Sequence, residues 1–439
     1  MGFLRGFSIA MGASIFMLVL SFLNNKLIYV FLSKSDNGVY FLFLRFSMLV
    51  SLVFGEWFRL SNVNIAGNDR DIIPDLSANN LWYTLSVCIC LLFAVVGFSP
   101  VIKILASGIP MKYIVASVVV GSAAMLRDSS LSILLVVKRM FRYGFTFVIW
   151  GTVAFVMNVV FLVIMKRGLD FAVAAWFIGI LASALWAYIS LVSGNGLRMK
   201  PSLAVFNMSR AIGIRSWLAV LGMFIMINVH VFIIGPLAGN AVEGLAMIAV
   251  FSVCFRIFQL LQRVSNVGGM ILLSHVVQEE KPKGFLMTMR VVRNIIFFSI
   301  VFCLMVLVAG KSVIRIISSS SYQVAYIPLL LLLPGIVAVN AGSIINNMYW
   351  GHGYPYKVIL APFAVTVVGV VLDIVLLPVL GVSGVSLSFS VMGLLWCVYM
   401  VIVFRNDSGF PFNAILFPQR EDVTQAISRV RLALSGGEQ

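Results

Sequence analysis

Polar side chains recur at helical spacing along one apolar segment near the middle of the chain. Ser252, Arg256, Gln259, Arg263 and Asn266 are separated by four, three, four and three residues, so an α-helix places them on a single face. The opposite face consists of Phe, Leu, Ile and Val. Because a guanidinium group binds phosphate oxygens through two hydrogen bonds, this face has the chemistry of a phosphate-binding site.

Burying these arginines in a membrane has a cost, which indicates where the face must point. A basic residue at the centre of a membrane helix costs about 2.5–3.5 kcal/mol on insertion, and a polar stripe facing lipid leaves its groups unsatisfied. We therefore expect the stripe to face protein or a water-filled cavity. Packing against polar partners is the structural explanation, and binding of an anionic substrate is the functional one.

Three further basic residues lie inside apolar segments. Lys26 lies near the end of its segment, so its ammonium group can instead extend to the membrane surface. Arg45 lies about two helical turns into the next segment and can partly do the same. Arg127 precedes Asp128 and can pair with it or with a neighbouring helix. The predicted substrate-binding residues are Arg256, Arg263, Lys26, Arg45, Arg127 and Gln259.

Acidic residues are scarce in the apolar segments, where only Glu56, Asp128 and Asp373 occur, with Glu243 at an edge. These carboxylates cannot neutralise the basic residues, so a shared cavity should be positive and select an anion. Intramembrane ionisable groups also relay ions. We predict an ion-coupling role for Asp373, Asp128 and His230, while a purely structural histidine is the alternative. The sequence indicates no catalytic group, metal ligand or cofactor.

The elements that position these residues are apolar helices. The chain has 439 residues, of which 61% are hydrophobic and 10% charged, with a mean hydropathy of +1.07. Runs of about 20 apolar residues recur along it, and each is long enough to cross a bilayer. The predicted fold is an all-α integral membrane protein with twelve transmembrane helices. The predicted spans are 7–31, 38–59, 81–106, 113–136, 143–165, 171–193, 214–236, 244–273, 294–311, 327–349, 357–378 and 383–404.

The basic residues also orient the chain. The net charge is +16, and no soluble domain is large enough to make this charge a nucleic-acid site. With a cytoplasmic N-terminus, 19 basic residues fall in inside segments and 7 in outside segments. This bias predicts cytoplasmic termini. The apolar run after Arg5 is too long for a signal peptide and lacks a small-residue cleavage site, so we expect it to be the first span.

The two halves of the chain resemble each other. The segment "VIKILAS" at 101–107 recurs as "VIRIISS" at 313–319, an offset of 212. An offset of six spans predicts two parallel six-helix bundles related by pseudo-symmetry, with a central cavity between them. The predicted parts are 1–205, 206–404 and a cytoplasmic tail at 405–439. We expect short connections, the longest of roughly 20 residues after the second, sixth and eighth spans. In the tail, 421–434 can form an amphipathic helix or remain solvated.

The C-terminal third carries motifs that resemble the polysaccharide-flippase family. An apolar run ends in Leu-Pro-Gly, a Gly-x-Gly turn follows, an aspartate-bearing span ends in Leu-Pro, and Gly-Val-x-Gly opens the last span. The stretch "LSKSDNGVYFLFLRFSML" resembles the first turn and second span of the family. The C-terminal motifs are Leu333-Pro334-Gly335, Gly351-His352-Gly353, Asp373 with Leu377-Pro378, and Gly381-Val382-Ser383-Gly384.

The resemblance implies a function. It is to flippases of O-antigen or exopolysaccharide repeat units in the bacterial cytoplasmic membrane, within the multidrug/oligosaccharidyl-lipid/polysaccharide exporter superfamily. Related flippases hold the diphosphate and sugar of an undecaprenyl-linked cargo in a cationic cavity and work by alternating access. Lys26, Arg45 and Arg256 lie on the spans that carry cationic residues in the peptidoglycan-precursor flippase, which usually has fourteen spans rather than twelve. The implied partners are an undecaprenyl-diphosphate-linked glycan, the lipid bilayer, a polysaccharide polymerase and a chain-length regulator.

Two other functions are compatible with parts of the sequence. A cation-coupled multidrug exporter of the same superfamily would need intramembrane carboxylates for cationic drugs, whereas the excess here is basic. A membrane polymerase would need a large outside loop for two glycans, whereas the predicted outside loops are short. We therefore expect a transporter and not an enzyme.

Overall fold

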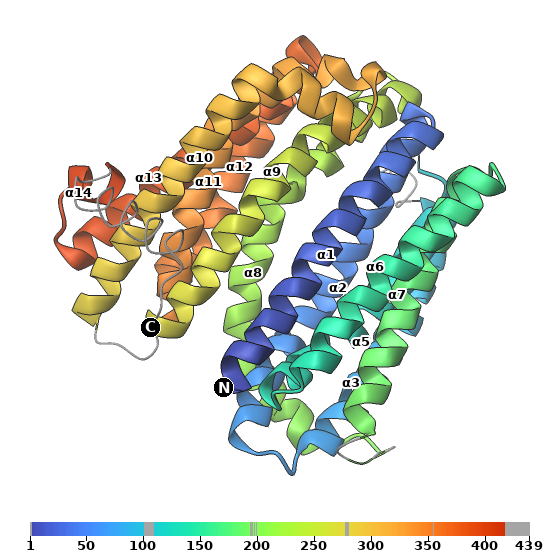
Figure 1. Ribbon diagram of the computed structural model, residues 1–439, viewed down its shortest axis with the longest axis vertical. Coiled ribbons are helices and arrows are strands. Elements are labelled where there is room, and N and C mark those ends of the chain that lie inside the picture. The colour runs from blue at the N-terminus through green and yellow to red at the C-terminus, as the bar shows by residue number, and fades with distance from the viewer. Residues whose placement is uncertain are drawn as a thin grey trace. The chain divides into compact units, whose positions relative to one another are not determined.

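The chain is built from long α-helices (Figure 1). The structure is a computed structural model that describes residues 2–100, 109–193, 196, 198, 200–276, 281–353 and 355–417. All regular secondary structure within these residues is helical, which confirms the predicted fold class. The amphipathic helix predicted at 421–434 lies outside the described residues.

Each predicted span overlaps an observed helix, although the helix of the third span ends at Gly97 and positions 101–106 of that span lie outside the described residues. Among the described residues, eleven helical stretches are long and apolar enough to cross a membrane. The first predicted span corresponds to α1 (Gly2–Phe31), whose described apolar part is Phe16–Phe31. The chain is thus a multi-pass membrane protein. The other helices are α2 (Lys34–Asn68), α3 (Ile73–Gly97), α5 (Met111–Val136), α6 (Met140–Asn158) with the π-helix η1 (Val159–Ile164), α7 (Leu169–Val192), α8 (Leu203–Leu237), α9 (Ala241–Val276), α10 (Lys281–Ile317), η2 (Ser320–Ala325), α11 (Tyr326–Gly351), α12 (Tyr356–Leu380), α13 (Val382–Ser408) and α14 (Phe412–Leu416).

The connections that we expected to be longest are shorter than predicted. After the second span the helix continues to Asn68, and the next helix begins at Ile73. After the eighth span, α9 continues to Val276 and α10 begins at Lys281. The prediction failed because helices do not end where hydrophobicity ends. Polar residues continue the backbone hydrogen bonds beyond the apolar part.

Local sequence signals explain where several helices begin and end. Ser33 caps α2, because its side-chain oxygen accepts the backbone N–H of Asp36 at 3.1 Å. Gly409 follows α13 with a φ of 76°, in the left-handed region. A glycine adopts this conformation without the strain that a side chain would add.

By their contacts the residues form two compact units, which we call the N-terminal and C-terminal units. The N-terminal unit consists of Met1–Phe224, Val231–Ser252 and Ile314–Gln323. The C-terminal unit consists of Ile225–His230, Val253–Val313 and Val324–Gln439. The helices α8, α9 and α10 and the 3-10 helix η2 therefore contribute residues to both units. The predicted division at 205/206 stays a prediction.

Corresponding helices pack together in each unit. In the N-terminal unit α7 packs against α5 and α6, and in the C-terminal unit α13 packs against α11 and α12. These are the same pairs six spans apart, as a duplicated chain requires. Small residues permit close approach: a Cβ on Gly121 of α5 would lie 2.6 Å from the Ser47 carbonyl oxygen on α2.

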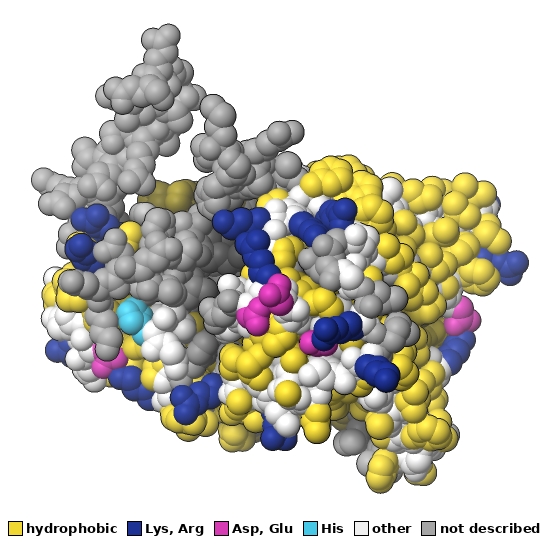
Figure 2. Space-filling model, turned by 90° about the horizontal axis from the view of Figure 1, so that it is seen from below, with side chains coloured by type: hydrophobic (Ala, Val, Ile, Leu, Met, Phe, Trp, Pro, Cys, Tyr) yellow, Lys and Arg dark blue, Asp and Glu magenta, His cyan; other side chains and the backbone are white. Residues whose placement is uncertain are grey.

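Large apolar side chains cover the outside of several helices. Phe93 on α3 is 75% exposed, Val379 on α12 is 78% exposed and Val308 on α10 is 86% exposed. Such exposure is unfavourable in water but natural in a bilayer, where lipid surrounds the helices. Seen from below, the molecule carries Lys and Arg side chains on the face in view, while apolar side chains dominate its flank (Figure 2).

Candidate substrate and ion-coupling sites

The predicted polar stripe lies along α9, as its spacing requires. The Arg256 Nη1 atom donates to the Gln259 side-chain oxygen at 3.4 Å, and both side chains are half-buried. One and two turns further on, Arg263 and Asn266 are exposed. The stripe thus changes from half-buried to accessible along its length, and the two arginines share one helix face.

The charge of this stripe is not offset on its own helix. The only acidic residue of α9 is Glu243, in its first turn. Among the described residues no carboxylate forms an ion pair with Arg263. An accessible guanidinium without a carboxylate partner is an available ligand for an anion.

The Lys26 ammonium group binds backbone carbonyl oxygens. Its ammonium donates to the backbone oxygen of Arg315 at 2.8 Å and to that of Ser318 at 2.5 Å. These oxygens lie at the C-terminal end of α10 and in the residue after it. Extension of Lys26 to the membrane surface therefore does not describe its position fully, because its ammonium group binds the end of α10.

Arg45 is buried on α2, with 2% of its surface exposed. Its guanidinium carbon lies 4.6 Å from the centre of the Phe41 ring. Its Nη1 atom lies 3.6 Å from the Met48 sulfur. The aromatic face stabilises a desolvated cation. Arg45 is thus a buried residue, whereas Arg263 is exposed.

Arg127 and Asp128 form an ion pair on α5. The Arg127 Nε atom lies 2.8 Å from the Asp128 Oδ1 atom, and the Arg127 guanidinium lies 4.9 Å from the Trp150 ring centre. Arg127 is 9% exposed. The structural alternative for Arg127, pairing with Asp128, is thus present in the structure, and its predicted substrate role stays a prediction, as does ion coupling by Asp128.

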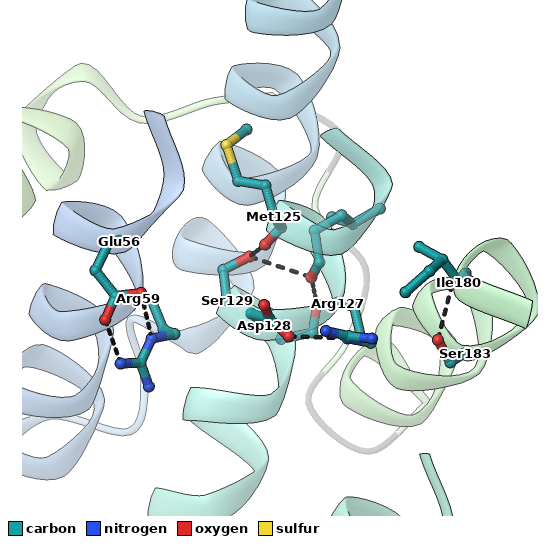
Figure 3. A network of polar contacts seen from close by, with 10 residues as sticks. Glu56, Arg59, Met125, Arg127, Asp128, Ser129, Ile180 and Ser183 are labelled. Carbon is teal, nitrogen blue, oxygen red and sulfur yellow. Dashed lines mark hydrogen bonds and ion pairs between the residues drawn. The ribbon is translucent and has the colours of Figure 1, made fainter. Parts of the chain in front are cut away.

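A second ion pair lies near the first and was missed from the sequence. Arg59 donates to Glu56 through two nitrogen atoms, one of them at 2.8 Å. Asp128 also interacts electrostatically with Arg59, and Figure 3 shows it between the two arginines. The cluster of Glu56, Arg59, Arg127 and Asp128 contains two charges of each sign. The i, i+3 spacing of Glu56 and Arg59 was the signal available in the sequence.

His230 and Asp373 meet in the C-terminal unit. The His230 Nδ1 atom on α8 lies 2.6 Å from the Asp373 Oδ2 atom on α12, and both side chains are fully buried. The sequence indicated each residue separately but not their pairing. A buried carboxylate in a membrane requires a partner, and His230 is the ionisable residue of α8 that supplies one.

Apolar groups lie beside the pair, and one further polar atom of each side chain is available for hydrogen bonding. The His230 ring lies 5.5 Å from the Phe389 ring, and a Cβ at Gly369 would lie 3.5 Å from the imidazole. Among the described residues, the His230 Nε2 and Asp373 Oδ1 atoms have no hydrogen-bond partner. Unsatisfied polar atoms in such a place are costly, so this pair is a candidate functional site.

The predicted residues thus fall into separate groups. In the N-terminal unit, Lys26, Arg45 and the Arg127–Asp128 pair have different partners. In the C-terminal unit, α9 carries Arg256, Gln259 and Arg263, and His230 pairs with Asp373. The shared cavity that we predicted between the halves stays a prediction.

Comparison of whole folds places this chain in a known structural class. Its fold is similar to those of solved membrane transporters, including two described as MOP superfamily members. One neighbour is the lipid II flippase MurJ in an inward closed conformation, with a TM-score of 0.73 and 16% identity, covering 98% of this chain and 93% of MurJ. Another is an inward-facing multidrug resistance transporter of the MATE family, with a TM-score of 0.67 and 13% identity, covering 90% of this chain and 94% of that one.

A third similar structure concerns binding-pocket charge. It is a MOP superfamily transporter from Pyrococcus furiosus, described as having a binding pocket of reverse polarity, with a TM-score of 0.63 and 14% identity, covering 92% of this chain and 94% of that one. No protein-family model matches the chain, and no curated protein matches it significantly in sequence. At these identities the similarity establishes the fold.

Proposed function

We propose that this protein is a flippase that moves undecaprenyl-diphosphate-linked oligosaccharide repeat units across the bacterial cytoplasmic membrane for O-antigen or exopolysaccharide assembly. The observation that carries the proposal is Arg263, an accessible arginine on an apolar helix that has no carboxylate ion-pair partner among the described residues. A cationic group placed at a cost in a membrane helix has a function by default. An anion is the ligand that matches it.

A diphosphate has enough oxygen atoms to bind both arginines of the α9 stripe at once. Two arginines seven residues apart on one helix face lie about 10 Å apart along the helix axis. Each guanidinium group binds a phosphate through paired hydrogen bonds. Gln259 lies between them and adds a side-chain amide that can bind a sugar hydroxyl group. The lipid tail of the cargo remains in the bilayer while the head moves between the halves by alternating access.

Ion coupling in this proposal belongs to His230 and Asp373. They form a hydrogen bond and are both fully buried, and a buried ionisable pair inside a membrane protein is a candidate relay for ions. Asp128 has an accessible part, with 34% of its side chain exposed, but it is already paired with Arg127. We therefore assign coupling to the buried pair first.

The proposed orientation has both termini in the cytoplasm, because basic residues concentrate on the inside segments. The proposed partners are the lipid-linked glycan, the bilayer, a polysaccharide polymerase and a chain-length regulator. The protein itself would act as a transporter and not as an enzyme.

The decisive experiment is complementation of a flippase-null bacterium whose repeat unit this protein exports. Arg256→Ala and Arg263→Ala should each abolish polysaccharide export at normal membrane levels of protein. Arg290→Ala is the matched control, because Arg290 is an exposed arginine of the same unit, on α10. Full export by both α9 variants would remove the stripe from the mechanism.

A cation-coupled multidrug exporter is the second candidate, and the buried Asp373 favours it. Such a protein uses an intramembrane carboxylate to exchange a cation for a drug. Resistance to cationic dyes on overexpression, without any polysaccharide phenotype, would favour this candidate. The basic α9 stripe makes it the weaker of the two.

A further inference from the structure

Lys26 holds the C-terminal end of a helix that lies far from it in sequence. The last carbonyl groups of an α-helix have no partners within the helix and carry a partial negative charge. The Lys26 ammonium donates to two backbone oxygens at this end of α10, those of Arg315 and Ser318, at 2.8 and 2.5 Å. A lysine in this position is a favourable helix cap. It joins α1 to the end of α10.

Aromatic and hydroxyl contacts accompany this cap. The Tyr29 hydroxyl, one turn beyond Lys26 on α1, forms a 2.8 Å hydrogen bond with Ser252 on α9. The Tyr29 ring packs edge-on against Tyr322, with 5.2 Å between ring centres. The Lys34 ammonium lies 5.7 Å from the centre of the same Tyr322 ring. The first two helices thus contact α9 and the α10–α11 connection at one end.

A backbone contact completes the set. A Cβ atom built on Gly38 of α2 would lie 2.0 Å from the Leu245 carbonyl oxygen on α9. Only glycine permits this approach, because any side chain would overlap the α9 backbone. We call this set of contacts the outer gate. It consists of Lys26, Tyr29, Lys34 and Gly38 on one side, and Leu245, Ser252, the Arg315 and Ser318 carbonyl groups and Tyr322 on the other.

The outer gate lies within the N-terminal unit, although α9 and α10 continue into the other unit. Val231–Ser252 and Ile314–Gln323 belong to the N-terminal unit, while Val253–Val313 belongs to the C-terminal unit. If α9 and α10 bend at these boundaries, the gate segments stay with the N-terminal unit and the gate contacts persist. If α9 and α10 instead move as straight helices with the C-terminal unit, the gate contacts break. Since α9 and α10 continue through the boundaries as regular helices, breaking the contacts is the simpler route.

We propose that Lys26 makes the outer gate sensitive to anions: a diphosphate that reaches Lys26 competes with the two α10 carbonyl groups for its ammonium and so releases the gate. This inference rests on the proposed function and specifies how cargo regulates it. The full charge of a diphosphate attracts an ammonium more strongly than the partial charge of a helix end does. Transfer of Lys26 from the carbonyls to the diphosphate leaves the end of α10 without its cap. The contacts that remain are the Tyr29–Ser252 hydrogen bond, the packing of Lys34 and Tyr29 on Tyr322, and the approach of Gly38 to Leu245.

The opening of the gate can be measured by spin-label distances. Phe31 and Gln323 are exposed and flank the gate, and both belong to the N-terminal unit. Cysteines at these two positions, in a chain whose five native cysteines are replaced by alanine, accept spin labels for pulsed dipolar spectroscopy. The full-length protein is reconstituted in lipid nanodiscs.

Without any ligand, Lys26→Gln should raise the ratio of long to short distances by about tenfold, which corresponds to the loss of one charge-assisted hydrogen bond. Lys26→Arg keeps the charge and the donors and should retain the short distance. Lys112→Gln is the matched control. It removes an ion pair with Asp170 of 2.6 Å that joins α5 to α7 and lies outside the gate, so the distance should not change.

Farnesyl diphosphate is the anionic probe, and farnesol is its uncharged counterpart. The diphosphate should shift the parent protein to the longer distance, while farnesol should not. The Lys26→Gln protein should show no further shift with the diphosphate. The proposal would be overturned if the diphosphate lengthened the distance equally in the Lys26→Gln protein and in the parent protein. It would also be overturned if, without ligand, the Lys26→Gln protein had the same distance as the parent protein.

A second variant tests the gate without changing Lys26, in case the Lys26 variants fail to fold. Gly38→Ala should give the longer distance with Lys26 intact, because the added methyl group cannot fit against Leu245. If this variant keeps the short distance, the gate is not held as described. Failure of the proposed function gives a different result: polysaccharide export would survive loss of Arg256 and Arg263, whatever the spin labels report.

Discussion

His230 and Asp373 are 143 residues apart in the chain, yet their side chains form a 2.6 Å hydrogen bond that is fully buried. Removal of one partner leaves the other buried without its hydrogen-bond partner, which costs about 1–3 kcal/mol. His230→Leu and Asp373→Leu should each lower the thermal unfolding temperature of the purified protein in detergent. The double variant should be more stable than either single variant, because it leaves no orphaned group. Additive losses would contradict the pairing.

The Arg127–Asp128 pair should behave as a structural unit. It is intermediate between a buried and a surface pair, so we expect a coupling energy of about 1–3 kcal/mol. A double-mutant cycle with Arg127→Gln and Asp128→Asn, followed by chemical unfolding, measures it. A coupling energy near zero would indicate that Arg127 is free to serve a ligand.

Gln259 offers a test of charge without removal of an arginine. Gln259→Glu places a carboxylate beside Arg256, within the 3.4 Å contact that the amide now makes. The new ion pair should neutralise the stripe and reduce export of the anionic cargo about tenfold or more. Gln259→Met removes the amide but adds no charge, and it should retain more activity in the same complementation assay. If the methionine variant is the weaker one, hydrogen bonding and not charge governs this position.

Gly121 should tolerate no side chain. An alanine there would bring its Cβ within 2.6 Å of the Ser47 carbonyl oxygen, and such overpacking costs about 1–3 kcal/mol. Gly97→Ala, where no atom lies within 4 Å of the added carbon, should leave the unfolding temperature unchanged or raise it. Equal behaviour of the two variants would mean that α2 and α5 are less tightly packed than described.

Chemical labelling should establish the orientation. Arg70 and Arg167 are both exposed. Arg70 lies in a connection predicted to face the cytoplasm, and Arg167 lies in one predicted to face the outside. In intact cells, an impermeant maleimide should label cysteine at position 167 in a cysteine-free protein. Cysteine at position 70 should react only after permeabilisation. The reverse pattern would place the termini outside.

Much of the fold follows from hydrophobicity alone. All twelve predicted spans overlap helices in the described residues, because about 20 apolar residues in a bilayer have few alternatives to a helix. Helix ends such as Asn68 and Val276 were misplaced, since they depend on capping and backbone hydrogen bonds and not on apolar length. The α9 stripe was visible because helical periodicity aligns residues on the same element.

Contacts between distant elements were not visible in the sequence. Lys26 was expected to reach a cavity or the membrane surface, whereas its ammonium caps α10. No periodicity predicts a contact between a side chain and backbone oxygens 289 and 292 residues away. The pairing of His230 with Asp373 was hidden for the same reason, although each residue was conspicuous alone.

The buried His230 lies on α8 directly before the point where the helix passes from one unit to the other. His230 is the last residue of a six-residue segment, Ile225–His230, that belongs to the C-terminal unit, and Val231 already belongs to the N-terminal one. Two positions after the histidine, Phe232 packs on Phe46 of α2 with 5.0 Å between ring centres. A change in the His230–Asp373 hydrogen bond would therefore reach the residue packed on α2 within α8 itself, without a chain of side-chain contacts.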